Sequence, residues 1–163
     1  MFKKITFFLM LLLYPFILFA QEDIVQGPFK IDDGISVYIK KENDINYPLG
    51  FYFQKNNESY KIDSYETDGD IPNIETVFLI KLNKMKNIIV LVSWHQEHRA
   101  EKISGDSYQV YGYTYKNNYL TPNKAITNDP NLSGQNGDFN GEELHFKYQN
   151  SASIIKYLKD KFN

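Results

Sequence analysis

The chain has 163 residues with 18 basic and 20 acidic side chains, which gives a formal net charge of −2 at pH 7. This composition offers no basic patch of the kind that nucleic acid binding requires, so we expect no nucleic acid partner. Cysteine is absent, which excludes disulfides and a lipid-anchored lipoprotein and leaves packing to stabilise the fold.

Residues 1–20 have the pattern of a cleavable secretory signal. Lys3 and Lys4 form a short positive start, a mostly apolar run follows, and Ala20 is a small residue directly before polar positions. The apolar run contains a proline and is short for a membrane span, which takes about 20 apolar residues. The segment therefore predicts export rather than a spanning helix.

Removal of the signal takes two lysines with it, so residues 21–163 carry 16 basic and 20 acidic side chains and a net charge of −4. We expect this segment to form one domain, periplasmic or secreted, with no stable membrane anchor. An uncleaved N-terminal anchor is the alternative, because leucine at position 18 fits the cleavage pattern less well than alanine would.

The first half of the domain has short strand patterns separated by turn residues. Residues 35–40 alternate between apolar and polar side chains, as in a half-buried strand, and residues 49–54 carry two phenylalanines on one face. Residues 25–31 contain a proline, which favours a sheet edge. The polar and acidic residues 63–73 predict a loop.

Two runs in the middle of the chain, 76–82 and 87–94, are apolar on both faces. Such runs suit central strands that are covered on both sides, and the short link between them predicts a hairpin. Residues 95–105 are polar and are expected to form a loop. Residues 108–115 have the composition of a further strand.

The end of the chain changes character. Residues 123–137 read as a long irregular segment, and Asn140-Gly141 is a hairpin signal ahead of alternating apolar residues at 144–148. Residues 151–162 have apolar side chains at helical spacing after a capping residue, Asn150 or Ser151. The predicted fold is α+β, mainly β: an antiparallel sheet or a sandwich, with a C-terminal amphipathic helix.

Candidate catalytic residues centre on the histidines. His95 and His98 flank Glu97 in a pattern similar to a zinc-site fragment, but the helical motif needs a spacing of four residues and a tetrahedral site needs four placed ligands. Ser93 and His95 share a strand face, yet the chain has no nucleophile-elbow motif. A cell-wall hydrolase that uses both histidines with Glu97 or Asp138 is one alternative function.

Asn136, Asp138 and Asn140 are candidate calcium ligands, because they match the first half of a calcium loop with glycine at the sixth position. The twelfth position is Lys147 where the motif needs glutamate, and the run also fits a simple hairpin turn. We therefore expect no metal and no cofactor.

Aromatic residues are abundant, with 13 tyrosines and 12 phenylalanines. Tyr111, Tyr113 and Tyr115 lie on one strand face, where they either pack inside or form an exposed row that grips a protein or a sugar. A carbohydrate-binding or small-ligand protein is thus a second alternative. Trp94 is the only tryptophan and Arg99 the only arginine; we favour a core position for Trp94.

The stretch from Asp63 to Glu75 carries five acidic residues and no basic one. Such a stretch is either a solvated loop or a negative surface that a basic partner recognises. The candidate partner-binding residues of the whole chain are Asp63, Glu66, Asp68, Asp70, Trp94, His95, His98, Arg99, Tyr111, Tyr113 and Tyr115.

In overall character, with a signal peptide, an acidic β-rich domain and a terminal helix, the chain resembles small exported bacterial immunity and inhibitor proteins. The resemblance includes no diagnostic motif and implies no family residues. It implies a periplasmic protein that inhibits a toxin or hydrolase by occluding its active site. On this interpretation the chain binds another protein and is not an enzyme.

Overall fold

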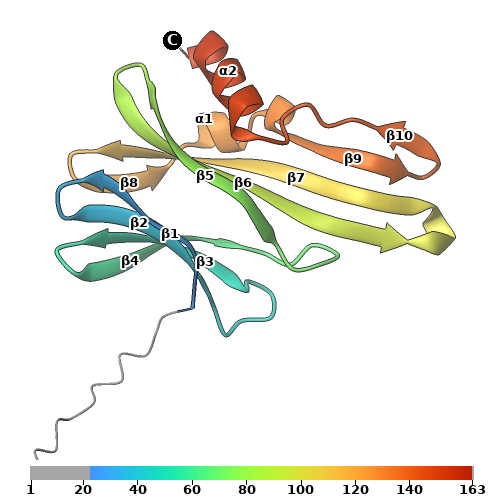
Figure 1. Cartoon of the computed structure of the whole chain (residues 1–163), viewed down its shortest axis with the longest axis horizontal. Coiled ribbons are helices and arrows are strands. Elements are labelled where there is room, and N and C mark those ends of the chain that lie inside the picture. The colour runs from blue at the N-terminus through green and yellow to red at the C-terminus, as the bar shows by residue number, and fades with distance from the viewer. Residues whose placement is uncertain (1–22, 163) are drawn as a thin grey trace, which may run out of the picture.

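The computed structural model describes residues 23–162, which form two antiparallel β-sheets and a set of helices (Figure 1). The predicted α+β, mainly β fold with a C-terminal helix is confirmed. The predicted signal over residues 1–20 lies outside the described residues. Within the described part, no helix is long and apolar enough to cross a membrane.

The small sheet contains the first four strands in chain order, each paired with the next. They are β1 (Ile24–Asp32), β2 (Ile35–Lys41), β3 (Leu49–Lys55) and β4 (Glu58–Tyr65). β1 lies at the edge of this sheet, as its proline predicted. β4 includes Asp63, so the acidic loop begins later than the sequence indicated.

The large sheet has the order β10-β9-β7-β6-β5, with β8 paired to β7. Its strands are β5 (Asn73–Leu82), β6 (Met85–His98), β7 (Ile103–Lys116), β8 (Tyr119–Pro122), β9 (Ser133–Phe139) and β10 (Glu142–Leu144). The predicted hairpin is confirmed as β5 and β6, which pair from Asn73 with Ser93 to Leu82 with Met85. The central position is confirmed for β6 but is wrong for β5, which lies at the edge of the sheet.

The expected loop at 95–105 is wrong, because β6 and β7 continue to pair as far as His98 with Ile103. Only the short 3₁₀ turn Arg99–Glu101 and Lys102 separate them. The side chains here are polar because this end of the hairpin extends past the small sheet (Figure 1). The polar side chains thus reflect the lack of a covering layer, and the backbone remains in strand conformation.

Four hairpins turn on two residues that both have positive φ, as type I′ turns require. These pairs are Asn56-Asn57, Asn83-Lys84, Asn117-Asn118 and Asn140-Gly141. The last pair confirms the hairpin predicted there, since Phe139 pairs with Glu142. The strand alternation expected at 144–148 is wrong beyond Leu144: the Phe146 ring stacks on Tyr108 instead, with ring centroids 5.3 Å apart.

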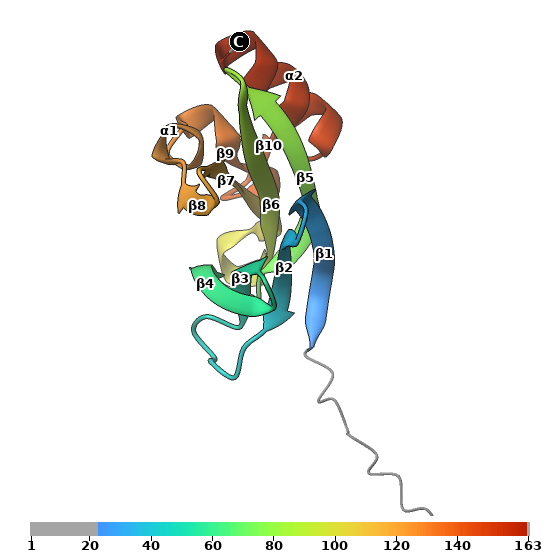
Figure 2. The same ribbon diagram turned by 90° about the vertical axis from the view of Figure 1, so that its left-hand side faces the viewer.

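β6 is covered on both faces, as its composition predicted. Ile88, Val90, Val92 and Trp94 belong to the core between the two sheets, whereas Ile89 and Leu91 belong to the core under the helices. The helix α2 (Ser151–Phe162) contributes Ile154 and Leu158 to this second core. Figure 2 shows the large sheet edge-on, with α2 and the small sheet around it.

The expected irregular segment at 123–137 is wrong in part. It contains the short helix α1 (Lys124–Thr127), the 3₁₀ turn Pro130–Leu132 and strand β9. Caps begin both helices of this region: the Asn123 side chain accepts from the Ala125 amide, and the Asn150 side chain accepts from the Ser153 amide. Two of the polar residues that suggested a loop in this segment, Asn123 and Asp129, are therefore capping residues.

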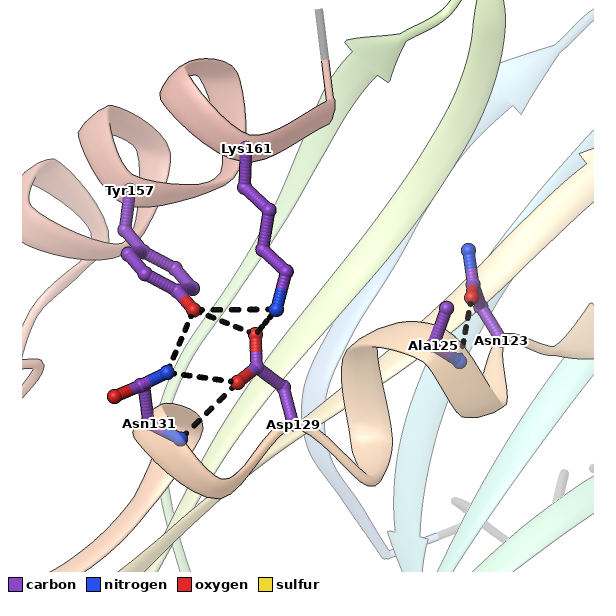
Figure 3. A network of polar contacts seen from close by, with 6 residues as sticks. All are labelled: Asn123, Ala125, Asp129, Asn131, Tyr157 and Lys161. Atoms are coloured by element: carbon purple, nitrogen blue, oxygen red, sulfur yellow. Dashed lines mark hydrogen bonds and ion pairs between the residues drawn. The ribbon is translucent and has the colours of Figure 1, made fainter.

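A buried carboxylate ties α2 to the 3₁₀ turn (Figure 3). Asp129, whose side chain is fully buried, accepts hydrogen bonds from Lys161 Nζ and Tyr157 Oη, both at 2.8 Å, and from the Asn131 amide at 3.1 Å. Burial alone raises the pKa of the Asp129 carboxyl, but the hydrogen bonds from Lys161, Tyr157 and Asn131 outweigh it, and the pKa lies below its usual value.

We expect Asp129→Ala to lower the free energy of unfolding by about 3 kcal/mol, because several hydrogen bonds to one buried carboxylate are lost. Urea unfolding at pH 7 measures this, with Asp160→Ala on the exposed face of α2 as the control, expected to change stability by less than about 0.5 kcal/mol. Equal effects of the two variants would contradict a stabilising role for Asp129.

The stabilisation by Asp129 should also depend on pH. Because its pKa is lowered on folding, its contribution is present above the unfolded value of about 3.9 and is lost as pH falls through the folded value. The stability difference between wild type and Asp129→Ala should therefore stay constant from neutral pH down to about 5 and shrink below about 4.

Candidate functional site

The acidic loop connects β4 to β5 and consists of residues 66–72. A pocket of about 430 Å³ lies where this loop meets strands β6, β7 and β9. Its lining includes Glu66, Asp68, Trp94, Ser107, Tyr111 and Gln135. Four of these, namely Glu66, Asp68, Trp94 and Tyr111, were predicted from the sequence to contact a partner. The fold thus brings lining residues from four separate segments to one place.

The floor of the pocket is one row of side chains across three strands. Trp94 on β6 pairs with Ser107 on β7, which pairs in turn with Gln135 on β9. Directly paired residues of antiparallel strands project from the same sheet face, so these three side chains stand next to one another. The row lies on the face that also carries the core between the two sheets.

Two side chains of β6 fix the acidic loop to this row. Trp94 Nε1 donates to the backbone carbonyl of Glu66 at 2.8 Å, and Gln96 Nε2 donates to the carbonyl of Asp68 at 2.7 Å. Trp94 itself is only 5% exposed. Because both anchors use backbone oxygens of the loop, they leave the carboxylates of Glu66 and Asp68 available.

The other side of the loop is held by the β2–β3 connection. The amide of Thr67 donates to the Asn46 carbonyl, and its hydroxyl donates to the Ile45 carbonyl, both at 2.8 Å. Gly69 has φ of +72°, a backbone conformation that other residues rarely adopt, so the turn favours glycine. The acidic loop is therefore ordered before any partner arrives.

The pocket is electrostatically negative. Glu66 and Asp68 are exposed, and neither forms an ion pair with any lysine, arginine or histidine of the described range 23–162. Burial, followed by the nearby carboxylates of Asp63, Glu66 and Asp68, raises the pKa of Tyr111 to about 12. Tyr111 thus keeps its proton and can donate a hydrogen bond.

A buried polar chain supports the pocket from behind. Tyr65 and Tyr113 share a hydrogen bond of 3.1 Å, and Tyr113 Oη donates to Asp63 Oδ2 at 2.8 Å. Burial raises the pKa of both tyrosines well above the usual value. Asp63 thus lies half-buried on β4, with its carboxylate bonded to Tyr113, and is not part of the exposed acidic loop.

Of the two alternatives for the tyrosine row, Tyr113 and Tyr115 follow the one in which the side chains pack inside. Tyr113 and Tyr115 are 1% and 9% exposed, because they belong to the core between the sheets. Only Tyr111, at the open end of this row, reaches the pocket, and its ring packs on Tyr65 with centroids 4.9 Å apart. The carbohydrate-binding alternative loses the exposed platform on which it depended.

The structure separates the histidines. His95 lies on the opposite face of β6 from Trp94 and pairs with Asp106 at 3.0 Å, a hydrogen bond that raises the pKa of His95. His98 is three residues further along, on the other face. In the described part of the chain, no group of three or more His, Cys, Asp or Glu side chains could hold a metal ion.

The other predicted residues also lie outside the pocket. Arg99 follows His98 in the turn at the far end of the β6–β7 hairpin, and it pairs with Glu97 at 3.7 Å. Asp70 caps its own turn by accepting from the Ile71 amide at 2.7 Å. The Ser93 hydroxyl donates to Glu75 at 2.6 Å and forms no hydrogen bond with His95, so these residues do not form a nucleophile–base pair.

The calcium candidates form a hairpin. Asn136 and Asp138 lie on β9 and Asn140 in the turn to β10, where strand geometry spreads their side chains along an extended backbone. Asn136 Oδ1 already accepts a hydrogen bond from Gln149 at 2.7 Å. The segment does not wrap around a common centre as a calcium loop does.

Ser107 and Gln135 are pocket residues that the sequence did not reveal. The Ser107 hydroxyl oxygen is inaccessible to solvent and is the one buried side-chain nitrogen or oxygen of the described residues that lacks a hydrogen-bond partner. The register of the β6–β7 hairpin would have placed it beside Trp94. The sequence does not show this register, because the polar composition of 95–105 predicts a loop and that of 123–137 predicts an irregular segment.

No protein-family model, curated protein or solved structure matches this chain. The most distinctive feature of the pocket is the acidic loop, which Trp94 and Gln96 fix by its backbone carbonyls. The exposed carboxylates of Glu66 and Asp68 give this surface a negative charge, which favours contact with a cationic group over an anionic one.

We expect Ser107→Ala to raise the free energy of unfolding by about 1 kcal/mol, because it removes a buried hydroxyl without a partner. Denaturant unfolding measures the change, and Ser104→Ala, an exposed position on the same strand, is the control and should stay within about 0.5 kcal/mol of wild type. A destabilised Ser107→Ala protein would show that the hydroxyl has a partner in solution.

Proposed function

We propose that the protein is an exported binding protein of the immunity type, which inhibits a toxin or hydrolase by inserting its acidic loop into the active site. One observation carries this proposal: Trp94 and Gln96 hold the loop in place by its backbone and leave Glu66 and Asp68 unpaired. The expected partner is an enzyme whose active site contains a basic side chain.

A fixed loop is suited to inhibition. A flexible loop loses conformational entropy on binding, at about 0.5–1.5 kcal/mol per immobilised side chain in addition to its backbone cost, whereas a preordered loop avoids most of this cost. The negative net charge of residues 21–163 adds long-range attraction to a basic cleft, which mainly raises the association rate. Export through the predicted signal would bring the protein to an enzyme outside the cytoplasm.

The test is affinity capture from native periplasm and culture medium, followed by an inhibition assay on the purified partner. The bait is expressed as the full chain, and its intact mass should show a first residue at Gln21. We expect one stoichiometric partner whose activity falls on addition of the protein. Glu66→Lys/Asp68→Lys should abolish both effects, because like charges would then face the basic cleft.

The control is Glu142→Lys/Asp160→Lys, which makes the same change in net charge at exposed positions on β10 and α2. It should bind and inhibit nearly as well as wild type. Both double variants should keep the melting temperature of wild type, since the loop anchors are backbone carbonyls. If the two variants weaken binding equally, or if the captured enzyme keeps full activity, the proposed function is wrong.

A further inference from the structure

We propose that a second pocket, at the opposite end of β4 from the acidic loop, binds a small aromatic carboxylate. This pocket has a volume of about 280 Å³ and lies between the β3–β4 hairpin of the small sheet and strand β8 of the large sheet. β4 and β8 are in contact there, and both lie on the same side of the molecule in Figure 1 and Figure 2. The inference is independent of the proposed function, because it uses no residue of the acidic loop.

The pocket has an apolar lining to which both sheets contribute. Phe53 of β3 and Leu120 of β8 close it from behind, and both are buried in the core between the sheets. The accessible apolar surface belongs to the half-buried Ile62 and to the exposed rings of Tyr60 and Tyr119. Because the core fixes the back of the pocket, the site is formed before a ligand arrives, and its lining favours a ligand with an apolar body.

Two accessible tyrosines line the pocket, one from each sheet. Tyr60 is 49% exposed and Tyr119 is 69% exposed. Tyr60 pairs with Phe53 across β3 and β4, so its ring projects from the sheet face that carries the core. Among the ring contacts of the described residues, none joins Tyr60 to Tyr119, so neither ring covers the other. An aromatic ligand would pack on these rings, and such contacts stabilise aromatic pairs beyond the area that they bury.

Lys55 supplies a positive charge to the same pocket. It lies two residues after Phe53 on β3, so its side chain shares the inward face of that strand beyond the end of the core. Lys55 Nζ is 5.8 Å from the centroid of the Tyr119 ring. Lys55 forms no ion pair with an acidic residue of the described range, and its cross-strand partner Glu58 accepts a hydrogen bond from Tyr60 instead. The ammonium group is therefore available to the carboxylate of a ligand.

Size and polarity narrow the class of ligand further. An apolar cavity of roughly 150 Å³ holds benzene, so this pocket accommodates one aromatic ring with a short acidic side chain. A sugar of similar size has hydroxyls on every side, and the apolar lining would leave several of them without hydrogen-bond partners. The hydrogen bond to Glu58 raises the pKa of Tyr60 above its usual value, so Tyr60 stays uncharged and does not repel an anion.

The test uses 3-phenylpropionate, which combines one aromatic ring with a carboxylate on a short chain. It is titrated into the full-chain protein, as purified, at pH 7, and ¹H–¹⁵N spectra are recorded. We expect saturable shifts of the backbone amides of Lys55, Tyr60 and Tyr119, with a dissociation constant on the order of 1 mM. The indole signal of Trp94, which lies at the other pocket, should not shift.

Two further compounds separate charge from ring. 3-Phenylpropionamide, which has nearly the same shape and no charge, should bind about fivefold more weakly, as expected for the loss of a solvent-accessible ion pair. Hexanoate, which keeps the charge but has no ring, should also bind about fivefold more weakly.

The variants assign these effects to residues. Lys55→Gln should weaken binding of 3-phenylpropionate about fivefold and leave binding of the amide unchanged. Lys81→Gln makes the same change in charge at an exposed position on β5 and should alter neither. Tyr119→Ala should weaken binding of both compounds about fivefold, because an aromatic contact is lost. Since Tyr119 is mostly exposed, this variant should keep the melting temperature of wild type.

Three results would overturn the inference. The first is the absence of saturable shifts at these three amides up to about 20 mM 3-phenylpropionate, which is well above the expected dissociation constant. The second is equal binding of 3-phenylpropionate and either its amide or hexanoate, since the pocket would then not select an aromatic carboxylate. The third is an equal loss of binding in Lys55→Gln and Lys81→Gln, because the effect would then come from net charge and not from the pocket.

Discussion

Strand β6 has apolar side chains on both faces, and each face must be removed from water. Ile88, Val90 and Val92 are fully buried against the small sheet, and Ile89 and Leu91 are fully buried under the helices. At roughly 1.5–3 kcal/mol for each buried aliphatic side chain, this strand is a large source of hydrophobic stabilisation. The β-sheet/β-sheet/helix order of the molecule follows from the need to cover β6 twice.

The pocket arises where that double cover ends. β6 and β7 are both 14 residues long, and Trp94 is the last buried residue of β6 before the exposed His95. The small sheet does not extend past this point, and the acidic loop covers its open end instead. The indole of Trp94 has two structural roles. Its ring completes the core between the sheets, and its N–H holds the acidic loop in place.

Hydrophobic periodicity predicted the elements that depend on burial. The apolar runs at 76–82 and 87–94, the proline-marked edge strand and the C-terminal helix all have short-range signals that directly reflect which faces are covered. Asn140-Gly141 was equally clear, since two residues with positive φ are costly for most side chains. These features could be predicted because each depends on a few neighbouring residues.

The site was only half predictable. Glu66 and Asp68 were detected by charge and Trp94 and Tyr111 by residue type, but Ser107 is an ordinary serine whose importance comes from its cross-strand neighbours. For the same reason the sequence leaves open whether Tyr113 and Tyr115 are buried: alternation shows that residues share a face but not whether a second sheet covers it. Register and layer order are long-range properties, and local patterns do not contain them.

The acidic loop is ordered in the free protein by its contacts with β6 and with the β2–β3 connection. Amide hydrogen exchange of Thr67 and Asp68 tests this most directly, because their amides donate to the Asn46 and Asp70 carbonyls. We predict exchange about 100-fold slower than in an unstructured peptide, and about tenfold faster in Trp94→Phe, with Val90 on β6 unchanged. If Thr67 and Asp68 of the wild-type protein exchange at the rate of an unstructured peptide, the acidic loop is not ordered in the free protein.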